Sequence, residues 1–110
     1  MSSPVTFNFQ GKTALVTGAS RGIGEAIARQ LDASGARVAL VARSADRLQA
    51  IAAELTNDPL VVAVDLAEHD AIEQISLAVM DAFGGLDVLV NNAAVERNQP
   101  ASKVTGEAID

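Results

Sequence analysis

Three glycines separated by short intervals lie near the start of the chain, at Gly18, Gly22 and Gly24. Glycine tolerates positive φ, and its lack of a side chain lets a ligand approach the backbone closely. A helix that begins here would direct its unpaired N–H groups and its positive dipole end into the same space. Such groups bind phosphate or pyrophosphate. The alternative is that the glycines only shape a tight turn.

The residues around these glycines predict a strand before them and a helix after them. Thr13–Thr17 is a short apolar run that contains β-branched residues, which is typical of a strand. From about Gly22, apolar residues recur at helical spacing, at Ile23, Ile27 and Leu31. Gly24 would lie in the first helical turn and permit close packing of helix on strand. This strand–turn–helix context favours phosphate binding over the simple turn.

The same alternation continues along the chain. Further strand-length runs occur at Arg37–Ala42, Leu60–Val64 and Leu86–Val90. Apolar residues at helical spacing lie between them, at Leu48, Ile51, Ala52 and Leu55 and at Ile72, Ile75, Val79 and Phe83. The expected boundaries are Gly35, Ser44 as an N-cap, Asn57–Pro59 and Gly84. We therefore predict an α/β fold of the Rossmann type, with a parallel sheet in the strand order 3-2-1-4, flanking helices and no strand after the fourth.

Composition limits the classes of protein to which this chain can belong. Its 110 residues suffice for one domain, residues 1–110, and 49% of them are hydrophobic but only 3% aromatic, as in a parallel sheet buried on both faces. The net charge of −6 argues against a nucleic-acid or anionic membrane partner. The chain has no cysteine for a disulfide or a thiolate metal site. Without a signal pattern or membrane-length apolar run, we expect a soluble cytoplasmic protein.

Three motifs together resemble one known family. Thr17–Gly24 resembles the T-G-x-x-x-G-I-G signature of the short-chain dehydrogenase/reductase family. Asp65-Leu66, after the third predicted strand, resembles its acidic adenine contact. Asn91–Ala94 resembles its N-N-A-G motif, with Ala94 in place of the final glycine. The resemblance runs from about Gly11 to Ala94 and implies an NAD(P)-dependent alcohol dehydrogenase or carbonyl reductase that acts on a small molecule.

The resemblance also implies roles for individual residues. The phosphates and the nicotinamide side would be lined by the turn, with Gly18, Ser20, Arg21, Gly22, Ile23 and Gly24. The adenine would meet Asp65 and Leu66, whereas the adenosine ribose would lie against Asn91 and Ala93. Taken alone, Asp65 could equally be a solvated acid at the end of a strand, and Asn91 a turn-forming residue. Their joint positions favour a cofactor site.

The end of the second predicted strand bears on the choice between NAD and NADP. An acidic side chain there binds the ribose 2′-hydroxyl of NAD, whereas an arginine binds the 2′-phosphate of NADP. This chain has Ala42 where NAD-preferring relatives carry Asp, and Arg43 follows it. Arg21 is a second cation that could reach the same phosphate, and guanidinium groups form paired hydrogen bonds with phosphate oxygens. We therefore predict NADP(H), while Arg47 is expected to face solvent.

The catalytic residues that the resemblance implies are missing from this sequence. The family uses a tyrosine, a lysine four residues later, a serine and an asparagine, but the chain has no tyrosine. Neither Lys103 nor His69 is placed to act as a substitute acid. The leading interpretation is an NADP(H)-dependent short-chain oxidoreductase of which only the cofactor-binding part is present. The alternatives are an inactive NADP(H)-binding or regulatory module and, last, another phosphate-ligand domain. The sequence leaves the oligomeric state open, a homo-oligomer included.

Overall fold

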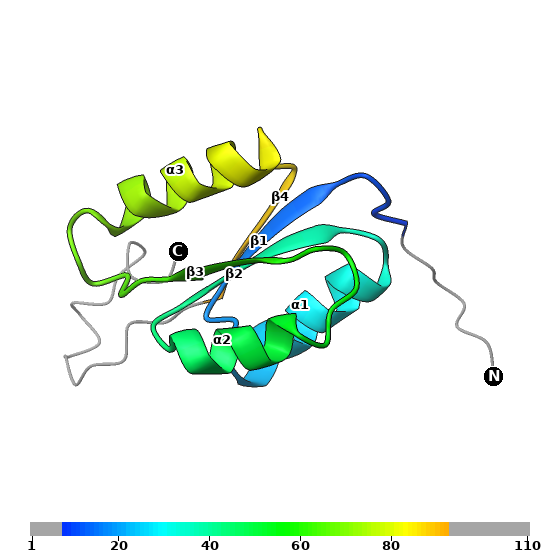
Figure 1. Cartoon of the computed structure of the whole chain (residues 1–110), viewed down its shortest axis with the longest axis horizontal. Coiled ribbons are helices and arrows are strands. Elements are labelled where there is room, and N and C mark those ends of the chain that lie inside the picture. The colour runs from blue at the N-terminus through cyan, green and yellow to red at the C-terminus, as the bar shows by residue number, and fades with distance from the viewer. Residues whose placement is uncertain (1–7, 93–110) are drawn as a thin grey trace, which may run out of the picture.

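The computed structural model describes residues 8–92, which form a four-stranded sheet with helices on both faces (Figure 1). In chain order the elements are β1 (Thr13–Thr17), α1 (Gly22–Ala33), β2 (Arg37–Ala42), α2 (Ala45–Ala52), β3 (Leu60–Ala63), α3 (Ala71–Phe83) and β4 (Val88–Asn91). All paired strands are parallel, and their order in the sheet is β3-β2-β1-β4. The predicted fold and strand order are confirmed.

Two apolar layers, one on each face of the sheet, form the core. Alternate residues of a strand point to opposite faces, so Val38 and Leu40 of β2 join the cluster with α1 and α2. Ala39 and Val41 join the cluster with α3, and Figure 1 shows α3 on the face opposite the other two helices. All four side chains are 0% exposed, because β2 has a strand on each side and helices on both faces. This double burial accounts for the predominantly aliphatic composition.

Glycines end two of the helices, as the sequence predicted. Gly35 follows α1 with φ +104, and the N–H of Ala36 donates to the carbonyl of Leu31 at 3.0 Å. This i to i−5 bond is the mark of a Schellman motif, which satisfies a carbonyl that the helix leaves without a partner. Gly84 ends α3 in the left-handed region, with φ +77. Both turns return the chain toward the next strand.

Two predicted apolar positions of the helices lie outside the core. Ile23 and Ile72 share the helical spacing of the apolar residues in α1 and α3, but they are 70% and 71% exposed. Both lie in the first turn of a helix, where the helix has only begun to pass over the sheet. In α3 the neighbouring Ala71 takes the buried place. Helical periodicity gives the direction of a side chain, but not whether another element lies opposite it.

The end of α2 also differs from the prediction. This helix ends at Ala52, several residues before the predicted stop at Asn57–Pro59. The carboxylate of Asp32, which is 6% exposed, accepts hydrogen bonds from the backbone N–H of Thr56 at 3.0 Å and of Asn57 at 3.0 Å. These bonds give the segment after α2 partners outside a helix, so the helical ladder stops early.

The strand boundaries shift by one or two residues. β3 ends at Ala63 instead of Val64, and β4 covers Val88–Asn91 instead of Leu86–Val90. Before β4, the carboxylate of Asp87 accepts a hydrogen bond from the N–H of Thr13 at 2.9 Å. The side chain of Asp87 thus holds the entry to β4 beside the start of β1.

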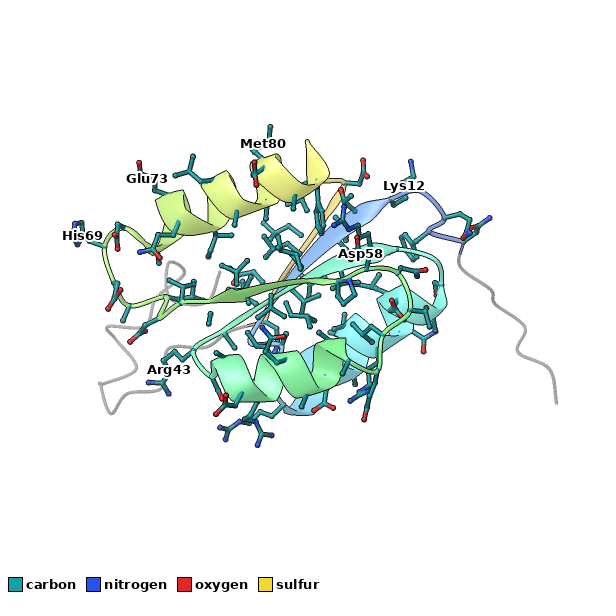
Figure 2. The ribbon with its side chains drawn as sticks, viewed as in Figure 1. Lys12, Arg43, Asp58, His69, Glu73 and Met80 are labelled. Atoms are coloured by element: carbon teal, nitrogen blue, oxygen red, sulfur yellow. The ribbon has the colours of Figure 1, made fainter. Side chains whose placement is uncertain are left out.

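The strand β4 lies at an edge of the described sheet, where it pairs with β1. Leu89 of β4 is 63% exposed. Met80 on α3 is also exposed and points away from the sheet (Figure 2). None of the helices described is long and apolar enough to cross a membrane.

Candidate nucleotide-binding site

The carboxyl ends of the parallel strands lie along one edge of the sheet, and the predicted site residues follow these ends. The glycine turn follows β1, Arg43 follows β2, Asp65 comes soon after β3, and Asn91 ends β4. Figure 2 shows Arg43 at this end of the molecule and Lys12, which precedes β1, at the other. In an α/β sheet, this edge is where ligands bind, at the point where the strand order reverses. Here the reversal falls between β1 and β4.

The glycine turn has the backbone conformation that its sequence predicted. Gly18 and Gly22 have φ +66 and φ +60, a region that other residues seldom adopt. Arg21 is the N-cap of α1, and its side chain makes no capping hydrogen bond. The N–H groups of the first turn of α1 are thus left without a side-chain cap at the edge of the sheet. They are suited to bind an anion.

Gly24 allows a close approach between the start of α1 and the residue that follows β1. A Cβ placed on Gly24 would collide with the carbonyl oxygen of Gly18 and lie 2.8 Å from Nδ2 of Asn92. The nearest neighbours of Gly24 are therefore the first residue of the glycine turn, which directly follows β1, and the residue that follows β4. A glycine at this position lets α1 start directly against the turn that precedes it.

Thr17 is a site residue that the sequence reasoning missed. Its side chain is buried at the end of β1, and its hydroxyl donates to Oδ1 of Asn91 at 3.1 Å. The hydroxyl oxygen of Thr17 in turn accepts a hydrogen bond from the backbone N–H of Asn92 at 2.9 Å. One hydroxyl thus connects the start of the glycine turn to the asparagines that follow β4. The signal in the sequence was the threonine that begins the Thr17–Gly24 motif, to which the sequence reasoning gave no role of its own.

Three arginines lie near the turn. Arg21 and Arg43 are exposed, and neither forms an ion pair within residues 8–92. Arg47 was expected to face solvent only. Its side chain is exposed, but its Nε donates to the backbone carbonyl of Ser20 at 3.2 Å. The prediction for Arg47 was therefore incomplete, because the contact crosses from α2 to the turn before α1.

The residues after β3 have local roles in the structure. Oδ1 of Asp65 accepts a hydrogen bond from the N–H of Ala67 at 2.9 Å, so Asp65 forms a local turn. Leu66 is partly buried against the α3 side of the core. Their contact with an adenine ring stays a prediction. β3 is separated from β1 by β2, so both residues lie further from the glycine turn than Asn91 does.

The remaining predicted residues are placed as follows. Ser20 is half-buried in the turn, and Ile23 and Asn91 are exposed at the same edge. Ala93 lies outside the described residues. His69 is exposed before α3, and within the described residues no group of His, Asp and Glu side chains is arranged to hold a metal ion.

Known proteins resemble this chain over almost its whole length. The family model for short chain dehydrogenase matches residues 12–110. Sorbitol dehydrogenase from Cereibacter sphaeroides is 38% identical over 100 residues, which are 91% of this chain and 39% of that protein.

Solved structures give the same result. L-sorbose reductase from Gluconobacter frateurii, solved with NADPH and L-sorbose, is 37% identical with a TM-score of 0.79, over 94% of this chain and 41% of that one. A metagenomic short-chain oxidoreductase in complex with NADP is 43% identical with a TM-score of 0.76, over 90% and 47%. The chain thus spans less than half the length of these proteins. On the match over residues 12–110, the chain belongs to the short-chain dehydrogenase family.

Proposed function

We propose that this chain binds NADP(H) as the nucleotide-binding part of an oxidoreductase that interconverts alcohol and carbonyl groups of a small molecule. The observation that carries the proposal is the uncapped N-terminus of α1 behind the glycine turn, with exposed arginines on the same edge. Family membership and the NADPH-bound and NADP-bound relatives support it. In this reaction the nicotinamide of the bound cofactor donates or accepts a hydride.

The glycine turn fits the phosphate groups of such a cofactor. Beyond its own helix and its chain neighbours, no atom of residues 8–92 lies within 4 Å of a Cβ placed on Gly22, so these residues leave space at the start of α1. The helix dipole and the uncapped N–H groups attract negative charge into that space. The residues that we propose to line the pyrophosphate and the nicotinamide side are Gly18, Ser20, Arg21, Gly22, Ile23 and Gly24. The 70% exposure of Ile23 leaves its side chain accessible to the nicotinamide side of a bound cofactor.

The preference for NADP(H) rests on the charge at the end of β2. Arg43 is exposed there, directly after Ala42, and Arg21 is exposed in the neighbouring turn. Neither is neutralised by an ion pair within residues 8–92, although the chain as a whole carries a charge of −6. A guanidinium group forms paired, charge-assisted hydrogen bonds with phosphate oxygens. We therefore assign the 2′-phosphate to Arg43, with a contribution from Arg21.

The other end of the nucleotide is assigned from the family motifs. We propose that Asp65 and Leu66 contact the adenine ring, while Asn91 and Ala93 lie against the adenosine ribose. Asn91 is suited to this role because the hydroxyl of Thr17 fixes its side-chain oxygen.

The chain contains no tyrosine, so the proton donor that the family resemblance implies is not among its residues. We assign no catalytic residue to this chain, and its proposed task is to bind and orient the cofactor. The same observation favours a second candidate function, an NADP(H)-binding or regulatory module without turnover. Both functions require the same nucleotide site.

The test is calorimetric titration of the purified chain with NADPH and, separately, NADH. We expect saturable binding that favours NADPH. Replacing Arg43 with aspartate should lower the ratio of NADPH to NADH affinity by about ten- to a hundredfold, since a hydrogen bond to a charged group contributes about 1.5–3 kcal/mol. Lys12→Asp is the control, because it makes the same change in charge at the opposite end of the sheet. Absence of binding to either cofactor contradicts the proposal, and an unchanged ratio in the Arg43 variant contradicts the 2′-phosphate assignment.

A further inference from the structure

A hydrogen bond from α2 reaches the glycine turn across the groove between α1 and α2. Arg47 lies in the first turn of α2, and its Nε donates to the carbonyl of Ser20 at 3.2 Å. The backbone N–H of Arg47 donates to Oγ of Ser44, the N-cap of the same helix, at 3.3 Å. Ser44 directly follows Arg43. The bond from Arg47 to Ser20 therefore joins the C-terminal end of the segment Arg43–Arg47 to the glycine turn.

The position of the Ser20 carbonyl determines how the peptide between Ser20 and Arg21 is oriented. In a trans peptide the C=O and the following N–H point in opposite directions, so holding the Ser20 oxygen also orients the N–H of Arg21. Arg21 is the extended N-cap residue of α1, with φ −165, and its side chain makes no capping bond. It precedes Gly22, which has the conformational freedom of glycine at φ +60. A fixed Ser20 peptide therefore reduces the motion available to the anion-binding end of α1.

A second arginine in the same groove has a different environment. Arg29 forms ion pairs with Glu25 at 2.9 Å and with Glu54 at 2.8 Å, and these hydrogen bonds raise the pKa of its guanidinium. Arg47 forms no ion pair with any described residue. The groove thus holds Arg29, which is paired with two acids, and Arg47, which is directed at the turn and has no acidic partner among the described residues.

We propose that Arg47 is a positioning residue of the nucleotide site. Its bond to Ser20 fixes the glycine turn before a ligand arrives. The inference rests on the proposed function, and it adds a residue that the glycine motif and the end of β2 do not include. Because the bond acts on the turn rather than on the 2′-phosphate, NADPH and NADH should depend on it equally.

The test compares three variants of the purified chain. Arg47→Met keeps most of the apolar stem but removes the donor and the charge, Arg47→Lys keeps a charged donor, and Arg29→Met removes a charge from the same groove. Each is titrated with NADPH and with NADH. Without nucleotide, NMR order parameters of the amides of Ser20 and Arg21 report the ps–ns motion of the turn.

We expect Arg47→Met to weaken the binding of NADPH and of NADH by about three- to tenfold, since one exposed charged hydrogen bond is lost. The same variant should lower the order parameters of the turn. The ratio of NADPH to NADH affinity should stay within about twofold, Arg47→Lys should restore most of the binding, and Arg29→Met should change neither quantity. Weakening of NADPH alone would place Arg47 at the 2′-phosphate and overturn the positioning role. Equal losses in Arg47→Met and Arg29→Met, or unchanged binding in Arg47→Met, overturn it too. If the unaltered chain binds neither cofactor, the proposed function itself fails, and the positioning role fails with it.

Discussion

Replacing Gly24 with alanine should destabilise the fold and disturb the glycine turn. Gly24 is buried in the first turn of α1. The added Cβ would collide with the carbonyl oxygen of Gly18, and it would lie 2.8 Å from both the carbonyl carbon of Gly18 and Nδ2 of Asn92. The Asn92 side chain can rotate, but Gly18 presents backbone atoms. Relief of the collision therefore requires α1 and the turn to move apart.

The expected cost follows from two opposing effects. Overpacking a close-packed site costs about 1–3 kcal/mol, and a collision with backbone belongs at the upper end of that range. Alanine in a helix recovers up to about 1 kcal/mol relative to glycine. We therefore expect a net loss of about 2 kcal/mol in the free energy of unfolding. In a domain of this size, each 1 kcal/mol lowers Tm by about 4–8 °C, so Tm should fall by about 8–16 °C.

Thermal unfolding followed by circular dichroism measures this change, and Gly85→Ala provides the control. Apart from its chain neighbours, no described residue has an atom within 4 Å of a Cβ added to Gly85, and Gly85 has no positive φ. Its replacement should therefore change stability by no more than about 0.5 kcal/mol. NADPH titration of the Gly24 variant below its Tm should also show weaker binding, because the turn has moved. If the two variants melt within about 2 °C of each other, the steric argument for Gly24 is refuted.

Substitutions at two further positions, Thr17 and Asp32, separate the site from the rest of the fold. Thr17→Val leaves the backbone N–H of Asn92 without its acceptor, so urea unfolding should show a loss of about 1–3 kcal/mol, with weaker NADPH binding. Thr17→Ser keeps the hydroxyl and should retain the stability and the NADPH affinity of the unaltered chain. If it does not, the methyl group of Thr17, rather than its hydroxyl, is responsible for them. Asp32→Asn should cost a similar amount, because an amide NH₂ would face the N–H groups of Thr56 and Asn57. NADPH affinity should be unchanged by Asp32→Asn, since this site is at the opposite edge of the sheet, and a clear decrease would contradict that separation.

Much of the fold could be predicted from local patterns. Short apolar runs alternating with helical spacing gave seven elements in the correct order, and each is present in the structure. The sequence also predicted turns or helix ends at four glycines, since glycine adopts a positive φ without steric cost. Each of them has a positive φ in the structure: Gly18, Gly22, Gly35 and Gly84. The boundaries were less accurate. Whether a strand ends at Ala63 or Val64 depends on its neighbour across the sheet.

The candidate site was only partly predictable. The glycine turn and Arg43 were identified because each directly follows a predicted strand, and the carboxyl ends of parallel strands share an edge. Thr17 and the contact of Arg47 were missed. The partner of Thr17 is Asn91, 74 residues further along the chain, and Ser20 is 27 residues from Arg47. No periodicity or motif within one element could indicate such pairs.

The sequence by itself determined the alternating elements and the conformation of the glycine turn, and it predicted an anionic ligand at the start of the first helix. These properties depend on the residue and its near neighbours, through allowed φ values, side-chain periodicity and the helix dipole. Only the tertiary structure decided that Ile23 is exposed, that Asp32 holds the segment after α2, and that Arg47 reaches the turn. Burial and long-range hydrogen bonds depend on which surfaces the packed helices and strands bring together.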